Sequence, residues 1–236
     1  MADPKRTLIV VPARGGSKRL PGKNLRALGG RSLLARTADA LRESGVAATC
    51  ILSTDDDAIA EAGLALGWQV PFRRPADLSD DAAPTAPVVR HTLDWFQGKR
   101  GSDPRYVLVL QATSPFRGSA CIVRALAMLA QNPQAQAVVA MTQLDRAPRH
   151  LFACDAHGYA TALLEADTPR PLFTPNGALY LVRTDAFRQT GSLFPPRTLP
   201  LPMDCVAAID IDDEDDWRLA EAAAAAGLTG VVRDTP

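Results

Sequence analysis

The chain has 236 residues, 47% of them hydrophobic and 22% charged, which is ordinary for a globular protein and enough for one α/β domain. Its 26 basic and 26 acidic side chains cancel, so no overall positive field exists to bind a nucleic-acid backbone. The sequence shows neither a secretion signal nor a run of about 20 apolar residues that would span a membrane. We therefore expect a cytoplasmic protein without nucleic-acid or membrane partners.

The four cysteines are widely spaced and form no C-x-x-C pair, and three of them lie in apolar sequence. This pattern predicts buried free thiols rather than a disulfide framework. The three histidines show no ligand spacing, so a zinc site is not expected.

The first half of the chain alternates strands with helices. Thr7–Ala13 is short, nearly all apolar and followed by glycines, which is typical of a strand buried on both faces. Ser32–Ser44 has apolar residues at helical spacing and ends before Gly45. The remaining predicted elements are strand Thr49–Thr54, helix Ala58–Leu66 behind the acidic start Asp55–Asp57, a short strand at Gln69–Arg73, helix Pro84–Phe96, strand Tyr106–Gln111, helix Ser119–Gln131 and strand Ala137–Thr142. This alternation predicts a doubly wound, mostly parallel sheet.

The pattern changes after Gln143. Asp145–Leu172 shows only a weak two-residue alternation, which predicts a β-rich excursion within a single domain of residues 1–236. A strong strand is predicted at Asn176–Thr184, and the last unit is predicted as strand Val206–Ile211 followed by helix Asp215–Ala226.

The loop Pro12–Asn24 is the first candidate site. It follows the first strand, and ligands of open parallel sheets bind beyond the carboxyl ends of strands. Gly15 and Gly16 allow close approach of the backbone and unusual dihedral angles, and four cations follow one another at Arg14, Lys18, Arg19 and Lys23. Backbone amides, a helix start and cations together suit a triphosphate. The loop matches neither the Walker nor the dinucleotide pattern, and the alternative is a solvated basic loop.

An acidic cluster near the end of the chain is the second candidate site. Six of the seven residues from Asp210 to Asp216 are acidic. Asp215 and Asp216 suit the N-terminus of the following helix. Asp210 and Asp212 end the predicted strand and, at a spacing of two, would point to one face. Paired carboxylates of this kind can hold Mg²⁺ against a triphosphate.

Several segments, taken in order and spacing, resemble the acylneuraminate cytidylyltransferases, that is, the CMP-sialic acid synthetases and their relatives. The matching segments are PARGGSKRLPGKN at Pro12–Asn24, STD at Ser53–Asp55, RPADL at Arg74–Leu78, LQATSPFR at Leu110–Arg117, NGALYL at Asn176–Leu181 and DIDDEDDWRLAE at Asp210–Glu221. The resemblance implies a Rossmann-like nucleotidyltransferase that joins CTP to a nine-carbon keto sugar acid such as N-acetylneuraminate or legionaminate. It also implies that the sugar's anomeric hydroxyl attacks the α-phosphorus and that pyrophosphate leaves.

The same resemblance implies roles for individual residues. Catalytic roles fall to Arg14, Lys18, Lys23 and Asp212, and the Mg²⁺ ligands are Asp210 and Asp212. The nucleotide contacts are Ala13, Arg14, Gly15, Gly16, Ser17, Lys18, Lys23, Asn24, Arg74, Ala83 and Thr85. The contacts to the sugar acid are Gln111, Thr113, Ser114, His150, Arg170 and Asn176. Gln111 has an alternative interpretation as a strand-end residue that satisfies backbone groups.

The chain departs from the family pattern on the side of the sugar acid. Ala112 replaces a usual proline, His150 stands where a lysine often meets the sugar carboxylate, Thr174 replaces a common arginine, and residues 170–176 are a few positions short. These changes leave the identity of the acid open.

Two alternatives to this function remain, and one region has two interpretations. The chain could be a cytidylyltransferase for the eight-carbon acid Kdo, whose signature also contains RLPGK, or a non-catalytic nucleotide- or sugar-binding module. Relatives pair through the region 145–172, so a homodimer is expected; a flap over the acceptor is the alternative for this region.

Overall fold

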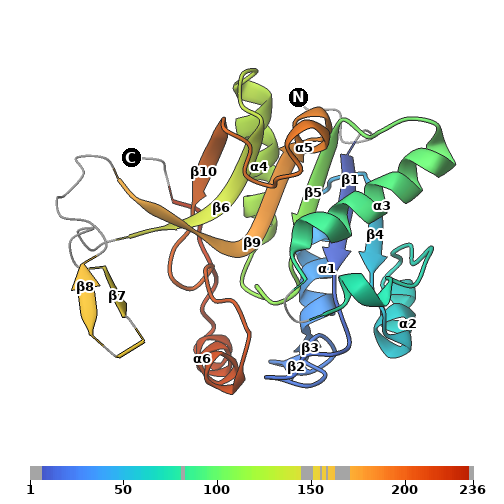
Figure 1. The fold of residues 1–236 in the computed structure, drawn as a ribbon. Coiled ribbons are helices and arrows are strands. Elements are labelled where there is room, and N and C mark those ends of the chain that lie inside the picture. The colour runs from blue at the N-terminus through green and yellow to red at the C-terminus, as the bar shows by residue number, and fades with distance from the viewer. Residues whose placement is uncertain are drawn as a thin grey trace.

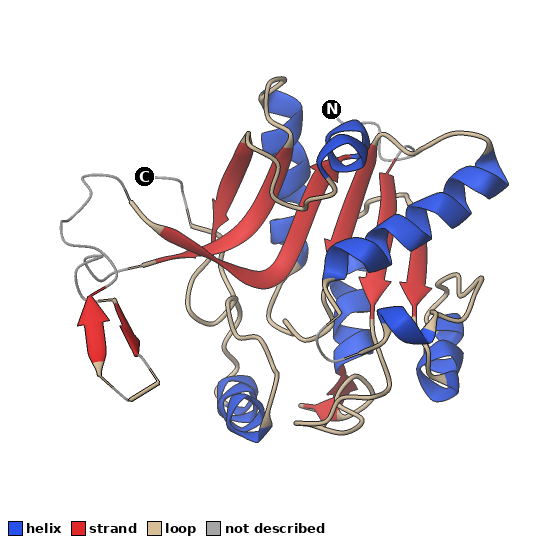
Figure 2. Ribbon diagram, in the orientation of Figure 1, coloured by secondary structure: helices blue, strands red, loops and turns tan. Residues whose placement is uncertain are grey.

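The computed structural model describes residues 7–80, 83–144, 151–154, 156–157, 159–162 and 171–233. Its centre is a six-stranded sheet in the order β10-β6-β9-β5-β1-β4, with helices on both faces (Figures 1 and 2). Strand β9 runs antiparallel to both of its neighbours, and the other pairs are parallel. The strands are β1 (Thr7–Pro12), β4 (Thr49–Ser53), β5 (Tyr106–Leu110), β6 (Ala137–Gln143), β9 (Phe173–Arg183) and β10 (Thr198–Pro202). The predicted α/β class with a mostly parallel sheet is confirmed.

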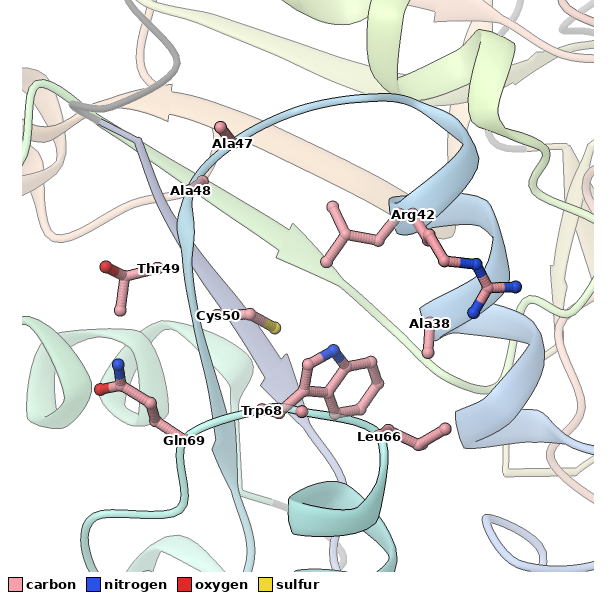
Figure 3. Close-up of a pocket in the computed structure, with 11 residues that line it drawn as sticks. Ala38, Arg42, Ala47, Ala48, Thr49, Cys50, Leu66, Trp68 and Gln69 are labelled. Atoms are coloured by element: carbon pink, nitrogen blue, oxygen red, sulfur yellow. The ribbon is translucent and has the colours of Figure 1, made fainter.

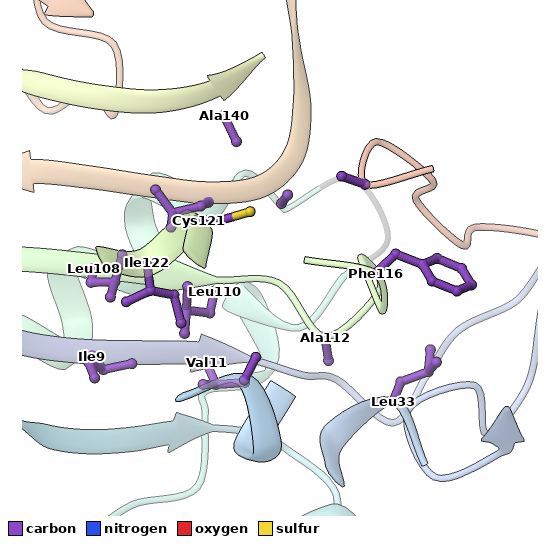
Figure 4. Packing of buried hydrophobic residues seen from close by; sticks show 14 of the residues in the cluster. Ile9, Val11, Leu33, Leu108, Leu110, Ala112, Phe116, Cys121, Ile122 and Ala140 are labelled. Carbon is purple, nitrogen blue, oxygen red and sulfur yellow. The ribbon is translucent and has the colours of Figure 1, made fainter. Parts of the chain in front are cut away.

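Side chains of the central strands alternate between two hydrophobic clusters, one on each face of the sheet. Ile9 and Val11 of β1 pack into the larger cluster, and Leu8 and Val10 pack into the smaller one. Figure 4 shows Ile9 and Val11 in the larger cluster. The larger cluster takes in residues of α1 (Leu33–Glu43), α4 (Ser119–Gln131) and α6 (Glu214–Ala225), and the smaller takes in residues of α3 (Thr85–Arg100) and α5 (Thr184–Thr190). Burial on both faces explains why the first strand reads as a continuous apolar run.

The carboxyl ends of β1 and β4 face the segments that carry the candidate site. The hairpin of β2 (Ala27–Leu28) and β3 (Arg31–Ser32) follows the loop after β1, and α6 packs beside it at the same end of the sheet (Figure 1). The short helices α2 (Asp57–Ala65) and η2 (Ala76–Leu78) follow β4. The fold therefore brings the first and last candidate segments of the chain together.

The predicted strand Val206–Ile211 is wrong. Residues 206–208 lie in a turn and residues 209–211 in an irregular loop. The side chains of Ala207 and Ile211 are fully buried there, so the apolar run reflects burial and not a strand. The strand that pairs with β6 is β10, whose sequence contains Pro200 and Pro202. Proline is tolerated there because β10 is an edge strand and its outer side needs no N–H donor.

Other predictions hold with smaller differences. The short strand predicted at Gln69–Arg73 is reduced to one bridge between Gln69 and Ile51, and α5 was not predicted. The antiparallel strands β7 (Phe152–Cys154) and β8 (Ala160–Ala162) lie in the predicted β-rich excursion, most of which is outside the described residues.

The cysteines and the helices bear on two further predictions. All four cysteines are free, and Cys50 and Cys121 are buried whereas Cys154 and Cys205 are exposed. The prediction of three buried thiols is therefore wrong for one.

Among the described helices, none has the length and apolar character that crossing a membrane requires.

Helix α6 begins with a capping box that supports the second candidate site. The Asp213 carboxylate accepts hydrogen bonds from the backbone N–H groups of Asp215 and Asp216, both at 3.1 Å. The Asp216 carboxylate in turn accepts from the N–H groups of Asp212 and Asp213, at 2.9 and 3.1 Å. The cap thereby fixes the backbone of Asp212.

The capping box gives a prediction for stability. Asp213→Ala should lower the free energy of unfolding by about 1 kcal/mol, because two N–H groups at the helix start lose their acceptor. Asp215→Ala is the matched control: its side chain is exposed and pairs with Arg218 at the surface, so its effect should stay within about 0.5 kcal/mol. Urea denaturation checks both, and equal losses in the two variants would contradict the role of the cap.

Candidate active site

A cleft of about 230 Å³ opens at the carboxyl ends of β1 and β5. All but two of its lining residues were predicted as site residues from the sequence. The lining residues are Pro12, Ala13, Arg14, Lys23, Asn24, Arg74, Ala83, Thr85, Val88, Gln111, Thr113, Asp210 and Asp212. Residues from five separate stretches of the chain therefore converge on one space.

The glycines of the loop after β1 have different roles. The backbone N–H of Gly15 donates to the Asp55 carboxylate at 3.1 Å, and a Cβ on Gly15 would lie 2.6 Å from the carboxylate of Asp56. Only glycine fits at this close approach. Gly16 has open space around it, and the residue of the loop with a positive φ is Gly22, at 67°. The protein's own packing thus requires glycine at Gly15, whereas at Gly16 neither a neighbouring atom nor a positive φ does.

The middle of the loop is held to its surroundings by Arg14 and Asn24. The Arg14 guanidinium donates to the carbonyl of Asp80 at 2.8 Å, and the Asn24 side-chain amide donates to the carbonyl of Arg14 at 3.0 Å. Ser17 is buried and Lys18 is exposed, and neither lines the cleft. The loop therefore presents Arg14 to the cleft from a fixed backbone.

Lys23 joins the loop to the acidic cluster. Its side chain is only 9% exposed, and its Nζ donates to the carbonyl of Ile211 at 2.8 Å and to Oδ1 of Asp212 at 2.9 Å. Arg19 donates to the other carboxylate oxygen of Asp212 at 2.7 Å. Burial raises the pKa of Asp212, but the hydrogen bond and charge of Lys23, together with Arg19, outweigh it and leave the pKa lowered. Asp212 is therefore held as a carboxylate, and Arg19 is a contact that the predicted site omitted.

Asp210 lies in a different environment from Asp212. Burial raises its pKa, a hydrogen bond with Thr113 opposes this, and the nearby charge of Asp212 adds to the increase. Its Oδ1 is buried without a hydrogen-bond partner among the described residues. The two aspartates do not share a strand, so the argument from strand spacing was wrong, yet both line the cleft.

The pair of aspartates suits a hard divalent cation. Asp212 is ionised, and the unpartnered Oδ1 of Asp210 is an oxygen that a ligand would satisfy. Within the described part of the chain, no three His, Cys, Asp or Glu side chains gather as a metal site. Mg²⁺ takes its ligands from one or two carboxylates together with substrate phosphates and water, so two carboxylates are enough for it.

Gly177 is a site residue that the predictions missed. Its φ is +81°, and a Cβ there would lie 2.7 Å from Oδ2 of Asp210 and 2.8 Å from Oε1 of Gln111. Any side chain at this position would push the side chains of Asp210 and Gln111 apart. The sequence signal was the Asn-Gly pair, which marks a backbone with positive φ.

Arg74 forms the end of the cleft nearest η2. Arg74 is 7% exposed, and its Nη2 lies 3.7 Å from the Asp55 carboxylate. Neither its Nε nor its Nη2 has a hydrogen-bond partner among the described residues. Burial lowers the pKa of its guanidinium and Asp55 partly offsets this. Buried donors without acceptors mark a place for a ligand with carbonyl or phosphate oxygens. Ala83 and Thr85 line the same cleft.

The acceptor side is only partly assembled around the cleft. Gln111 lines it and donates from its side-chain amide to Thr85 at 3.4 Å. Ser114 is fully buried and does not line the cleft, and Asn176 bonds to Thr142 and to the N–H of Ala178. The predicted contacts His150 and Arg170 lie outside the described residues.

A larger cavity, of about 540 Å³, lies at the opposite end of β4 and is shown in Figure 3. Its walls come from the ends of α1 and α2 and include Leu41, Leu66 and Trp68. The only charged side chain in its lining, Arg42, pairs with Asp39. Opposed charges meet instead in the smaller cleft, which is therefore the candidate active site.

Comparison with known proteins identifies the family of the chain. A family model described as cytidylyltransferase matches residues 8–211. The chain is 32% identical over 225 residues to the CMP-N,N'-diacetyllegionaminic acid synthase of Legionella pneumophila, covering 92% of this chain and 95% of that protein. It is 30% identical over 218 residues to an N-acylneuraminate cytidylyltransferase of Streptococcus agalactiae, covering 89% of this chain but 51% of the relative, so it spans about half of that enzyme.

A solved structure gives the same fold. The CMP:2-keto-3-deoxy-manno-octonic acid synthetase complexed with CTP aligns with a TM-score of 0.68 at 16% identity, covering 94% of this chain and 99% of that one. At this identity the likeness concerns the fold alone. Because the family model extends over most of the sequence, the chain belongs to the cytidylyltransferase family and is a nucleotidyltransferase.

Proposed function

We propose that this protein transfers CMP from CTP to the anomeric hydroxyl of a nine-carbon keto sugar acid and releases pyrophosphate. The observation that carries the proposal is the single cleft in which loop cations and the carboxylates of Asp210 and Asp212 meet. The similarity to enzymes named for legionaminic and neuraminic acids supports the nine-carbon acceptor over the eight-carbon one.

The loop after β1 is proposed to bind the triphosphate. Arg14, Lys18 and Lys23 offset charge on the triphosphate and on the departing pyrophosphate, as electrostatic stabilisation of phosphoryl chemistry requires. Gly15, Gly16, Ser17 and Asn24 supply the backbone and the amide that shape this loop, with Ala13 at its start. Catalysis then consists mostly of positioning and charge neutralisation, without a histidine as general base.

Asp210 and Asp212 are proposed to hold Mg²⁺. When bound, the ion would polarise the α-phosphate and lower the pKa of the attacking hydroxyl. Lys23 and Arg19 keep Asp212 ionised, which is the state a metal ligand needs.

The two ends of the cleft are proposed to take the two reacting partners. Arg74, with unpartnered donors, and Ala83 and Thr85 surround the cytosine. Gln111 and Thr113 face the sugar acid, with Ser114 and Asn176 behind them and His150 and Arg170 from the acceptor segment.

The direct test is pyrophosphate release from CTP across a panel of sugar acids. N-acetylneuraminic, legionaminic, pseudaminic, Kdn and Kdo acids are each incubated with the protein, CTP and Mg²⁺. We expect release with at least one nine-carbon acid, at a rate at least about tenfold above Kdo. Release with Kdo alone would favour the eight-carbon enzyme, and CTP binding without release would make the protein a binding module.

We also propose that the protein is a homodimer that pairs through the region 145–172. The hairpin β7–β8 projects from the body of the molecule (Figure 1), and Phe152 and Tyr159 on it are exposed. Exposed aromatic side chains are enriched in protein–protein interfaces. Light scattering should give twice the 25.2 kDa chain mass, and Phe152→Ser should shift the equilibrium toward monomer. A mass of one chain at micromolar concentration would leave the region as a flap over the acceptor.

A further inference from the structure

Arg117 is a buried charge that the proposed reaction does not use. It ends the segment Leu110–Arg117, its residue is 2% exposed, and burial lowers the pKa of its guanidinium to about 10. Among the described residues no carboxylate pairs with it, and its Nε has no hydrogen-bond partner. A buried cation without a counter-ion is costly, so its hydrogen bonds must carry a specific role.

The hydrogen bonds of Arg117 go to two backbone carbonyls on neighbouring strands. Its Nη1 lies 2.9 Å from the carbonyl oxygen of Gln111 and 2.9 Å from that of Ala178. The last residue pair of the β5–β9 ladder is Leu110 with Leu179. The two carbonyls belong to the residues just beyond this pair, Gln111 after Leu110 and Ala178 before Leu179. The guanidinium therefore continues the ladder at the place where β9 bends away from β5 toward β6 (Figure 1).

One of the two carbonyls belongs to a residue of the cleft lining, and the other belongs to the neighbour of Gly177, which packs closely against that lining. Gln111 lines the cleft, and Ala178 directly follows Gly177. The backbone of Gly177 approaches the side chains of Gln111 and Asp210 so closely that no Cβ fits. A small displacement of either strand end would therefore move Gln111 relative to the carboxylate of Asp210.

We propose that Arg117 is a positioning residue that fixes the backbones of Gln111 and Ala178, and with Ala178 the adjoining Gly177, and so sets the placement of the Gln111 side chain toward the sugar acid. The inference rests on the proposed function, which assigns Gln111 to the acceptor. Arg117 itself touches neither substrate. A planar guanidinium with several fixed donors suits two carbonyls at the end of a ladder better than a single ammonium does.

The test compares two arginines that both donate to backbone carbonyls, Arg117 beside the cleft and the less buried Arg183 far from it. Arg117→Met keeps the apolar stem and removes the donors. Arg183→Met is the matched control: Arg183 also donates to backbone carbonyls, of Ala135 at 2.7 Å and Pro133 at 3.2 Å, but at the opposite end of β9. The active fraction of each protein is taken from the stoichiometry of CTP binding in calorimetry, so that loss of folded protein does not count as loss of rate.

For Arg117→Met we expect kcat/KM for the sugar acid at saturating CTP to fall at least about tenfold, since small misplacement near the reacting groups is costly. The Kd for CTP should change by less than about threefold, and Arg183→Met should match the wild type in both quantities within the same factor. Equal losses in CTP affinity and acceptor kcat/KM, or wild-type kinetics in Arg117→Met, would overturn the inference.

A double-mutant cycle with Gln111→Ala tests whether Arg117 acts through Gln111. In the Gln111→Ala background, Arg117→Met should cost less than about threefold in kcat/KM for the acid, because the side chain that it positions is gone. Additive losses would contradict the proposal. If Arg117→Met does not fold, Arg117→Lys replaces it, with the same expected split between acid and CTP. Failure of both variants to fold would give Arg117 a purely structural role and overturn the inference.

The two proposals fail in different ways. If wild-type protein releases no pyrophosphate with any acid, the proposed function fails. If the wild type is active and Arg117→Met behaves like Arg183→Met, only the inference about Arg117 fails.

Discussion

The hydrogen bonds of Lys23 connect the two ends of the chain at the site. Its ammonium is buried and is satisfied by the carbonyl of Ile211 and the carboxylate of Asp212, which lie almost at the other end of the sequence. A buried cation without such partners would be strongly unfavourable, so the loop after β1 and the segment before α6 stabilise each other's placement. Arg26 adds a second link, because its guanidinium pairs with Glu214 and lies 4.0 Å from the ring centroid of Trp217. The cleft exists because these segments are joined.

The same contacts give the two aspartates different electrostatic environments. Asp212 sits between two cations and has a lowered pKa, whereas Asp210 is more deeply buried and has a raised pKa. The protein has thus already neutralised one carboxylate with its own cations. If Asp212 holds Mg²⁺ when CTP binds, Lys23 and Arg19 would lose part of their bond to its carboxylate and would be available to the phosphates. Affinity for the nucleotide and for the metal would then depend on each other.

The sequence predicted most of the residues that line the cleft, for a physical reason. Ligands of parallel sheets bind at the carboxyl ends of strands, and β1 and β5 were recognisable as apolar runs, so Arg14 and Gln111 could be placed at the same edge. The prediction of Val206–Ile211 failed because a buried turn and a buried strand have the same apolar composition. The edge strand β10 was missed because its prolines argue against a strand unless its edge position is known.

Other features depend on tertiary contacts that no local pattern contains. Gly177 and Arg117 were both inside recognised motifs, but their roles come from strands β5 and β9 meeting beside Asp210. Gly15 and Gly16 look alike in sequence, and only the approach of Asp56 distinguishes them. His150 and Thr174 depart from the family pattern in the segments predicted to contact the sugar acid. The family motifs therefore identify the nucleotide more closely than they identify the acid.

The most direct test of the central claim is Asp212→Ala, because this carboxylate belongs to both the ion-pair cluster and the proposed metal site. Pyrophosphate release is measured against Mg²⁺ concentration, and the melting temperature is measured with and without Mg²⁺ and CTP. The account predicts a folded protein whose release falls at least about 10²-fold at all Mg²⁺ concentrations and whose melting temperature no longer rises with Mg²⁺ and CTP together. Near wild-type rates at saturating Mg²⁺ would contradict it.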